Sequence, residues 1–482
     1  MTRSRVRRTR WVALAVASAA LAIAAPPIAN AATGDAATAP GIAWAPCAQD
    51  ATAQCGTLSV PVDWADPSGP RFDLAVARRL ATEPAARVGT LVFGPGGPGD
   101  SGVTRVVTGS SRFSAELRRR FDIVSFDPRG VGLSNPMVCS PELLARRPAP
   151  VLANQADFDA TLAYNRELRE DCRARTGPVF DHADTLSTVR DVDALRAALG
   201  EEKLTFHGSS YGTLLGEQYA ETFPKRVRAI VLESVVDHSL GGVRDFLTTQ
   251  GASAQDSFDE FVAWCAATEA CALHGRDVRA VWADLLARAG RGELSNAANP
   301  AVAVTPFDLV VTAHRAFTGP SWADLATRLA TMDGGGLAKV AVLPPFVNAV
   351  FCADWSLPVR DYREYADLLR RTAKVAPDMR YPAQVAALTQ CLGWPRPVVN
   401  PQHTLKVRGT PKILLINALH DPATGYSWAT NVARQLGDRG VLVTYEGWGH
   451  GSYTRNACTT GVVDRYLISL ETPAPGTTCP AV

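Results

Sequence analysis

The stretch that most restricts the fold is the run Gly-Ser-Ser-Tyr-Gly at residues 208–212, which reads as G-x-S-x-G. A strand-like run, 203–207, precedes it, and a run with helical spacing, 213–220, follows it. In this context the motif forms a tight strand-to-helix turn that presents a reactive serine, and the flanking glycines leave room where a Cβ would clash. We therefore interpret Ser210 as a nucleophile, and not as part of an ordinary Gly/Ser turn.

Strand-like and helical runs alternate on both sides of this turn. Buried-strand patterns occur at 90–93, 121–127, 203–207, 228–232, 412–417 and 440–445, and an amphipathic helix is expected at 185–199. Such alternation predicts an α/β fold with a mostly parallel sheet. Two earlier strands are expected at 58–62 and 72–78.

The alternation of strand-like and helical runs stops between residues 237 and 404, where helical patterns dominate. Thr305-Pro306 with Asp308 predicts a capped helix start, Ser321 with Asp324 predicts a second, and 361–375 reads as a third helix. We expect a helical cap at 237–404, inserted into a core made of 42–236 and 405–482.

A serine hydroxyl needs a base, and the base needs an orienting carboxylate. Asp421 follows the predicted strand 412–417, and His450 follows the predicted strand 440–445. Ser210, Asp421 and His450 occur in the chain order of an α/β-hydrolase triad. Each would lie at the carboxyl edge of the sheet, where open α/β sheets build their sites.

Several neighbours compete for these roles. His420 is the rival histidine, although it adjoins Asp421 and is expected to shape that loop, and Glu446 is the alternative acid. Asp127 and Arg129 follow a buried strand, and we interpret them as an ion pair that locks a turn.

A Gly/Pro-rich loop, 94–102, follows the strand 90–93. It lacks the Gly-Lys-Ser/Thr of a phosphate loop. In serine hydrolases the loop after this strand supplies one oxyanion N–H, and the residue after the nucleophile supplies the other. These donors would be Gly97 and Tyr211.

The N-terminus predicts export. Five arginines and no acid lie in the first ten residues, an apolar run covers 11–25, and Ala29-Asn30-Ala31 fits a cleavage site, so 1–31 reads as a signal peptide. The whole chain has a formal charge of +2, and a chain cut after Ala31 carries −3. That charge argues against nucleic acid and anionic membrane as partners. Residues 32–41 are expected to be a flexible segment.

Ten cysteines follow the signal, at positions 47, 55, 139, 172, 265, 271, 352, 391, 458 and 479. An even number in an exported chain predicts disulfides, whose connectivity the sequence leaves open; pairing of nearest neighbours is one guess. No C-x-x-C or H-E-x-x-H pattern is present, so we expect no metal and no cofactor.

With these motifs in place, the chain resembles the secreted tripeptidyl aminopeptidases of actinomycetes, in the proline-iminopeptidase-like branch of the α/β hydrolases. The likeness covers the Trp44 to Cys47 start, the loop 94–102, the run 127–130, the elbow, and the segments around Asp421 and His450. Two departures are Asp100, where relatives commonly carry Gly, and Glu233-Ser234, where Asp-Gly is more usual.

The resemblance implies a secreted, monomeric serine exopeptidase that releases short peptides, tripeptides foremost, from free N-termini. Such an enzyme needs a carboxylate for the substrate ammonium, and the candidates are Asp354, Glu233 and Asp237. Related chains include esterases, so a carboxylesterase is the second hypothesis and a non-catalytic binding protein on the same fold is the third.

Overall fold

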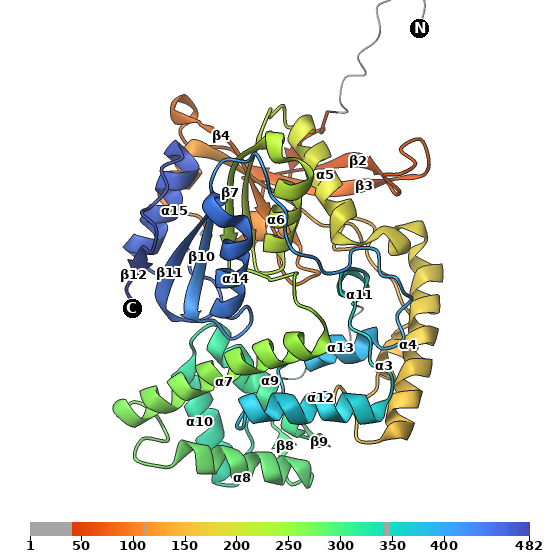
Figure 1. The fold of residues 1–482 in the computed structure, drawn as a ribbon, viewed down its shortest axis with the longest axis vertical. Helices are drawn as coiled ribbons and strands as arrows, with labels where there is room; N and C mark the ends of the chain where they lie inside the picture. Colours follow the sequence, from red (N-terminus) through yellow and green to blue (C-terminus); the bar gives the residue numbers. More distant parts are fainter. Residues whose placement is uncertain (1–40, 110–111, 342, 344–347) are drawn as a thin grey trace, which may run out of the picture. The chain divides into compact units, whose positions relative to one another are not determined.

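The computed structural model describes residues 41–109, 112–341, 343 and 348–482, and its main element is one large sheet (Figure 1). Within these ranges the sheet strands are β1 (Ala45–Pro46), β2 (Gln54–Pro61), β3 (Arg71–Arg79), β4 (Gly89–Gly94), β5 (Phe121–Phe126), β6 (Leu204–Ser209), β7 (Val227–Glu233), β10 (Ile413–His420), β11 (Gly440–Trp448) and β12 (Thr478–Cys479). They lie in the order β1-β2-β3-β5-β4-β6-β7-β10-β11-β12.

The sheet is antiparallel from β1 to β5 and parallel from β5 through β4 to β12. Gly94 pairs with Gly208, and Ser209 pairs with Glu233. The last residues of β4, β6 and β7 therefore lie side by side, and the segments that follow them meet at one edge. This confirms the α/β fold with a mostly parallel sheet.

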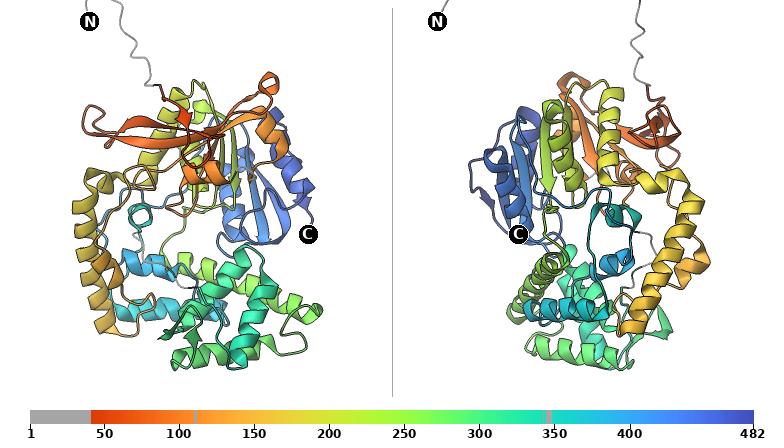
Figure 2. Two further views of the ribbon diagram at one scale, coloured as in Figure 1. Left: turned by 180° about the vertical axis from the view of Figure 1, so that it is seen from behind. Right: turned by 45° about the vertical axis from the view of Figure 1, so that its right-hand side comes forward.

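Helices cover both faces of the sheet, and Figures 1 and 2 show the layers from different sides. One layer holds α5 (Thr185–Ala198), α6 (Gly212–Thr222) and α14 (Tyr426–Leu436). The other holds α1 (Gly102–Thr108), α2 (Ala115–Arg120) and α15 (Ala457–Ser469). Each layer buries its own apolar cluster against the strands, and this burial is the main force holding the sheet in place.

Helices dominate the segment between β7 and β10, as the sequence predicts. They are α7 (Val243–Ala267), α8 (Val278–Gly290), α9 (Pro306–Thr318), α10 (Trp322–Asp333), α11 (Ala349–Asp354), α12 (Tyr362–Val375) and α13 (Val385–Cys391), with a hairpin of β8 (Ser295–Asn296) and β9 (Asn299–Ala303). Several of them share an apolar cluster that includes Phe258, Phe261 and Trp282. We call 237–404 the cap; its exact bounds stay a prediction.

The predicted capped start of α9 is confirmed. The Thr305 hydroxyl accepts the backbone N–H of Asp308, and the Asp308 carboxylate accepts the backbone N–H of Thr305. The second predicted cap is wrong in detail. Ser321 precedes α10, but its side chain makes no capping hydrogen bond, and Asp324 pairs instead with Arg328, 2.8 Å away.

A second helical insertion joins the cap from the first half of the core. It consists of α3 (Pro141–Ala145) and the 22-residue α4 (Gln155–Thr176). The amide nitrogen of Asn165 donates to the carbonyls of Thr389 and Leu392, both at 2.9 Å. Sequence periodicity does not reveal such contacts, because the partners are more than 200 positions apart.

The predicted ion pair of Arg129 with Asp127 is wrong. Arg129 forms a fully buried, bidentate ion pair with Asp191 of α5, with both N–O distances 2.7 Å. Asp127 instead accepts hydrogen bonds from the Ser101 hydroxyl at 2.6 Å and from the N–H of Leu133 at 2.8 Å. Both residues lock turns, but with different partners.

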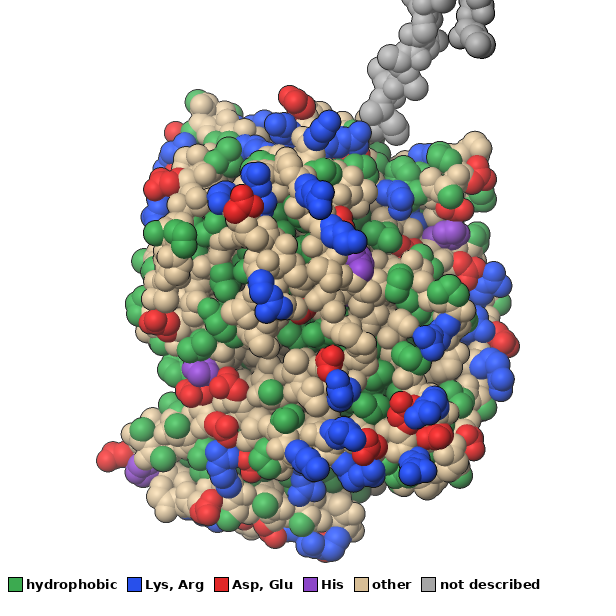
Figure 3. Space-filling model, viewed as in Figure 1, with side chains coloured by type: hydrophobic (Ala, Val, Ile, Leu, Met, Phe, Trp, Pro, Cys, Tyr) green, Lys and Arg blue, Asp and Glu red, His purple; other side chains and the backbone are tan. Residues whose placement is uncertain are grey.

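Five disulfides join consecutive cysteines: 47–55, 139–172, 265–271, 352–391 and 458–479. The predicted signal peptide and flexible segment lie outside the described residues, except for Gly41. No helix among the described residues is long and apolar enough to cross a membrane. On the face drawn in Figure 3, basic and acidic side chains are interspersed.

Candidate active site

Ser210 lies at the turn between β6 and α6, with φ at +55°. Its N–H donates to the carbonyl of Glu233 at 2.9 Å, which holds the turn against β7. A non-glycine residue at positive φ is strained by about 1 kcal/mol or more. The strain is typical of a nucleophile elbow.

The two glycines of the motif are required by close packing. A Cβ on Gly208 would lie 2.3 Å from the carbonyl oxygen of Gly212, and a Cβ on Gly212 would lie 2.2 Å from that of Gly94. No side chain can occupy either position without moving the backbone. The glycines thus let β4, the elbow and α6 approach one another.

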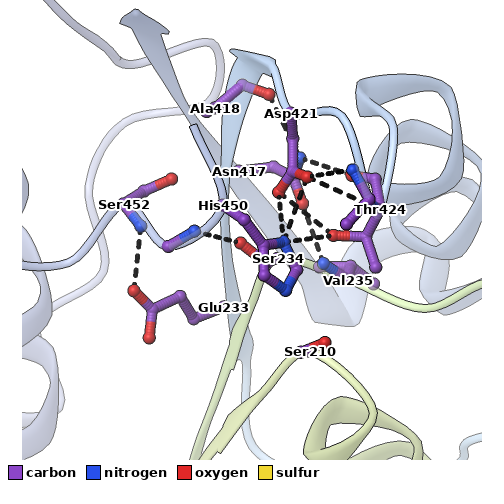
Figure 4. A network of polar contacts seen from close by, with 12 residues as sticks. Ser210, Glu233, Ser234, Val235, Asn417, Ala418, Asp421, Thr424, His450 and Ser452 are labelled. Atoms are coloured by element: carbon purple, nitrogen blue, oxygen red, sulfur yellow. Dashed lines mark hydrogen bonds and ion pairs between the residues drawn. The ribbon is translucent and has the colours of Figure 1, made fainter. Parts of the chain in front are cut away.

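Asp421 and His450 are joined as the sequence predicts. Nδ1 of His450 lies 3.0 Å from each carboxylate oxygen of Asp421. Asp421 is buried and also accepts the N–H groups of Ala423 and Thr424, at 2.8 and 2.9 Å. These donors leave the carboxylate oriented toward the imidazole (Figure 4).

The charges of this pair reinforce each other. Burial raises the pKa of Asp421, but the attraction of His450 and the hydrogen bonds outweigh burial, so its pKa lies below the ordinary value. Burial lowers the pKa of His450, and the Asp421 carboxylate outweighs that effect and raises it. A histidine held in this way is a stronger base than a free one.

Figure 4 shows the ring edge of His450 that faces away from Asp421 directed toward Ser210. Neither the Ser210 hydroxyl nor Nε2 of His450 forms a hydrogen bond with any described residue. Such contacts are often long before substrate binds. The structure therefore brings the three residues to one edge of the sheet and leaves the reactive atoms of two of them free.

The two predicted oxyanion donors are also free. Among the described residues, neither the Tyr211 N–H nor the Gly97 N–H finds a hydrogen-bond acceptor. A Cβ on the neighbouring Gly96 would lie 3.1 Å from Cβ of Ser210, so the loop 94–102 packs directly against the nucleophile.

The segment after His450 is fixed from several sides. The His450 N–H donates to the carbonyl of Thr318, at the end of cap helix α9, at 2.9 Å. The Gly451 N–H donates to the Ser234 hydroxyl at 2.9 Å, and the Ser452 N–H donates to the Glu233 carboxylate at 2.9 Å (Figure 4). Core and cap together position the imidazole.

Two further residues lie near the imidazole that the sequence does not predict as part of the site. The Thr424 hydroxyl lies 3.1 Å from the Asp421 carboxylate and 3.4 Å from Nδ1 of His450. His314 of α9 has a pKa of about 4, lowered first by burial and then by the charge of His450. A polar residue three positions after the acid is the one local signal that could have drawn attention to Thr424.

The rival residues face elsewhere. Nδ1 of His420 lies 2.9 Å from the Asp256 carboxylate of α7, so His420 belongs to the boundary with the cap. Glu446 is exposed on β11. The structure thus pairs Asp421, not Glu446, with His450.

All three candidate carboxylates for a substrate ammonium are buried and bound to protein donors. Asp354 accepts from Thr185, Tyr211 and Asn400. Glu233 contacts Arg112, His207, Ser452 and Tyr453. Asp237 accepts from Ser239, Asn431 and Gln435. Their predicted role stays a prediction.

Their electrostatic states differ. Burial raises the pKa of Asp354 to about 7, against the smaller opposite effect of its hydrogen bonds. Burial also raises the pKa of Glu233, but Arg112 and His207 outweigh it and leave the pKa well below its ordinary value. Across the described residues, no group of three or more His, Cys, Asp or Glu side chains could hold a metal ion.

Comparison with known proteins gives two family matches. Residues 379–479 match the model of the TAP-like proteins, and residues 89–312 match the model of the alpha/beta hydrolase fold. The chain is similar to a tripeptidyl aminopeptidase of Streptomyces lividans, with 32% identity over 91% of this chain and 86% of the relative.

Two other relatives carry different names. Serine protease Hip1 of Mycobacterium tuberculosis is 31% identical over 91% of each chain. Carboxylesterase B of the same organism is 30% identical over 95% of each chain. The relatives thus include proteins named for peptide hydrolysis and one named for ester hydrolysis.

Proposed function

The chain belongs to the tripeptidyl-aminopeptidase-like family of serine hydrolases with the α/β-hydrolase fold, and from that premise we propose that it is an exopeptidase releasing short peptides, tripeptides foremost, from free N-termini. The observation that supports this most is the Asp421–His450 pair, with both N–O distances 3.0 Å, at the sheet edge that carries Ser210. The peptidase names among the relatives point the same way.

In the proposed reaction, Nε2 of His450 takes the proton of the Ser210 hydroxyl as the oxygen attacks the scissile carbonyl. Asp421 holds the imidazole so that Nδ1 carries the other proton, and its negative charge stabilises the imidazolium that forms. His450 then gives its proton to the leaving amine, which departs and leaves an acyl-enzyme. Water, activated by the same imidazole, releases the short peptide and restores the serine.

The amides of Tyr211 and Gly97 would bind the oxyanion. Each such donor is worth about 3 kcal/mol in serine proteases. Because both N–H groups are unpaired among the described residues, both are available to donate to the oxyanion. Preorganised donors of this kind are the largest single contribution to many acyl-transfer rates.

An exopeptidase must also recognise an ammonium, and a carboxylate already saturated by protein donors serves poorly. Asp256 and Glu260 of α7 are better placed, because their side chains are 47% and 32% exposed. They flank His420, which adjoins Asp421, and Trp448 donates to Glu260 at 2.8 Å. We place the ammonium site at these two acids, ahead of Asp354, Glu233 and Asp237.

We further propose that the protein acts outside the cell as a monomer, with its signal peptide removed near Ala31. Five disulfides fit an oxidising compartment. The N-terminal sequence of the protein collected from the culture medium tests the cleavage, and a chain that still began at Met1 would refute the removal of the signal peptide.

The competing function is that of a carboxylesterase, which the name of one relative favours. Kinetics on three matched substrates separate the two: a tripeptide arylamide with a free N-terminus, its N-acylated form, and a short acyl ester. We expect the free peptide to be strongly preferred, Ser210→Ala to abolish its turnover while the protein stays folded, and Glu260→Gln to raise KM for that substrate alone. Turnover of the blocked peptide and of the ester at the rate of the free peptide would refute the exopeptidase.

A non-catalytic binding protein is separated by covalent labelling. A fluorophosphonate should label the protein at Ser210 and fail to label Ser210→Ala. A wild-type protein that stays unlabelled and turns over no substrate would revive the binding-protein hypothesis.

A further inference from the structure

One buried carboxylate connects the cap to the residue after the nucleophile. Asp354, the last residue of α11, has no exposed surface. Its Oδ2 accepts the Tyr211 hydroxyl and the Thr185 hydroxyl, both at 2.6 Å. Its Oδ1 accepts the Thr185 N–H and the Asn400 amide, both at 2.9 Å. Four donors from three separate segments thus converge on one side chain of the cap.

The two oxygens of this carboxylate already accept four hydrogen bonds, all from neutral protein groups. A substrate ammonium could bind there only by displacing one of these donors. A buried acid with satisfied oxygens and no cation beside it is a costly feature to maintain. Stability alone gives no reason for it, so its position beside the elbow suggests a role in the site.

The hydroxyl that it holds belongs to a proposed oxyanion donor. Tyr211 follows Ser210 directly and is 7% exposed, and its side chain runs from the elbow to α11. Tyr211 and Thr185 line a small cavity together with Gly96 and Pro98 of the other donor's loop. Tyr211 also belongs to an apolar cluster with Phe351 and Trp355 of the cap, so it adjoins both the cap and the oxyanion loop.

We propose that Asp354 is a positioning residue, which fixes the Tyr211 backbone N–H toward the oxyanion by holding the Tyr211 hydroxyl. The inference rests on the proposed roles of Ser210 and Tyr211, and it replaces the ammonium-binding role expected for Asp354. Because the Tyr211 side chain is held at its hydroxyl, the backbone peptide of Tyr211 cannot tilt freely. Small displacements of a donor lower the rate of the chemical step much more than they lower substrate affinity.

The anchor is itself stiffly held. Cys352, two residues before Asp354, is bonded to Cys391 of α13. The Asn400 N–H donates to the carbonyl of Ala353 at 3.0 Å, and the Asn400 side chain exchanges hydrogen bonds with Gln218 of α6. The cap therefore contributes a fixed point to the catalytic edge of the sheet.

The test compares Tyr211→Phe, Asp354→Ala, Asp354→Asn and the double variant Tyr211→Phe/Asp354→Ala. We expect kcat to fall about tenfold in either of the first two, with KM changed less than twofold. The same factor should appear with the free peptide, the N-acylated peptide and the ester. Asp354→Asn, which can still accept a hydroxyl, should recover part of the loss, and the double variant should be no slower than the slower single one.

A matched control, another tyrosine hydroxyl bound to a buried carboxylate, lies within the core. Tyr219 of α6 donates its hydroxyl to Asp193 of α5 at 2.9 Å, far along α6 from the elbow. Tyr219→Phe should leave kcat within twofold of the wild type. Thermal melts show which variants fold, and if Asp354→Ala does not fold, Tyr211→Phe decides alone.

Two results would overturn the proposal. An unchanged kcat in folded Tyr211→Phe would show that the hydroxyl anchors nothing that matters. A loss confined to KM for free N-termini in folded Asp354→Asn would restore the ammonium role. Because the fall in kcat relative to the wild type is measured on esters as well as on peptides, it remains measurable if the exopeptidase assignment fails. Failure of the catalytic assignment itself would appear separately, as activity in Ser210→Ala.

Discussion

The side chain of Glu233 offers a sharp test of the electrostatics behind the active site. Glu233→Gln keeps the shape of the side chain and removes its charge. One carboxylate oxygen accepts the N–H groups of Ser452 and Tyr453, both at 2.9 Å. The other lies 2.7 Å from Nη2 of Arg112 and 3.0 Å from Nε2 of His207.

The expected cost follows from these contacts. A glutamine that keeps its oxygen toward Ser452 and Tyr453 turns its NH₂ toward Arg112, donor against donor. Breaking a fully buried ion pair in this way costs about 3–5 kcal/mol. The Arg112 side chain is 29% exposed, so water compensates part of its charge, and we expect a loss of about 2–3 kcal/mol in the free energy of unfolding.

The loss should depend on pH, because the folded-state pKa of Glu233 lies well below its ordinary value. A depressed carboxyl pKa stabilises the fold above the pKa of the unfolded chain, about 4.3, and that stabilisation is lost as the pH falls below it. The difference between wild type and Glu233→Gln should therefore be full at pH 7 and shrink below pH 4.

Calorimetry provides the measurement. For a chain of this size, each kcal/mol shifts the melting temperature by about 1 °C, so we expect Glu233→Gln to melt about 2–3 °C lower at pH 7. The control is Glu202→Gln, at an exposed glutamate, which should melt like the wild type. Equal melting of both variants at pH 7 would refute the argument, and so would a deficit that persists unchanged at pH 3.5.

Three further predictions concern the imidazole and the core. On the acid side of the pH–rate profile, kcat/KM should fall to half its plateau above pH 6.5, because Asp421 raises the pKa of His450 and only the neutral ring can act as a base. In Asp421→Asn the same kinetic measurement should give a kcat about 10⁴-fold lower. Thr424→Val should lower kcat about tenfold without changing the melting temperature, since it removes a hydroxyl 3.1 Å from Asp421; an unchanged kcat would show that this hydroxyl does not orient the pair. Arg129→Met should cost about 3–5 kcal/mol in thermal or urea unfolding, because it leaves the charge of Asp191 buried alone, and Arg129→Met/Asp191→Leu should recover most of that loss.

The core of the site was predictable because its signals are local. The elbow, the strand before Asp421 and the strand before His450 are each readable within about ten residues, and parallel strands bring their carboxyl ends to one edge. The disulfides 47–55 and 265–271 and the helix start at Thr305 are local in the same sense.

The errors arise where a residue's partner is distant in sequence. The sequence predicts an ion pair of Arg129 with its neighbour Asp127, but the partner of Arg129 is Asp191, 62 positions away on α5. The sequence likewise cannot show whether acids near the site, such as Asp354 and Glu233, already have protein partners. Only the fold shows that protein donors, from Tyr211 and Thr185 in one case and Arg112 in the other, already fill their oxygens.

The cap contributes contacts to two groups of the candidate active site. Its helix α9 supplies the Thr318 carbonyl that holds the His450 amide, and its helix α11 supplies the Asp354 carboxylate that holds Tyr211. His450, the proposed base, and Tyr211, a proposed oxyanion donor, thus each form a hydrogen bond with the cap, while Ser210 bonds to Glu233 of the core. A displacement of the cap would move the base and the donor relative to the nucleophile, so the rate of the chemical step should respond to cap position even for substrates too small to touch the cap.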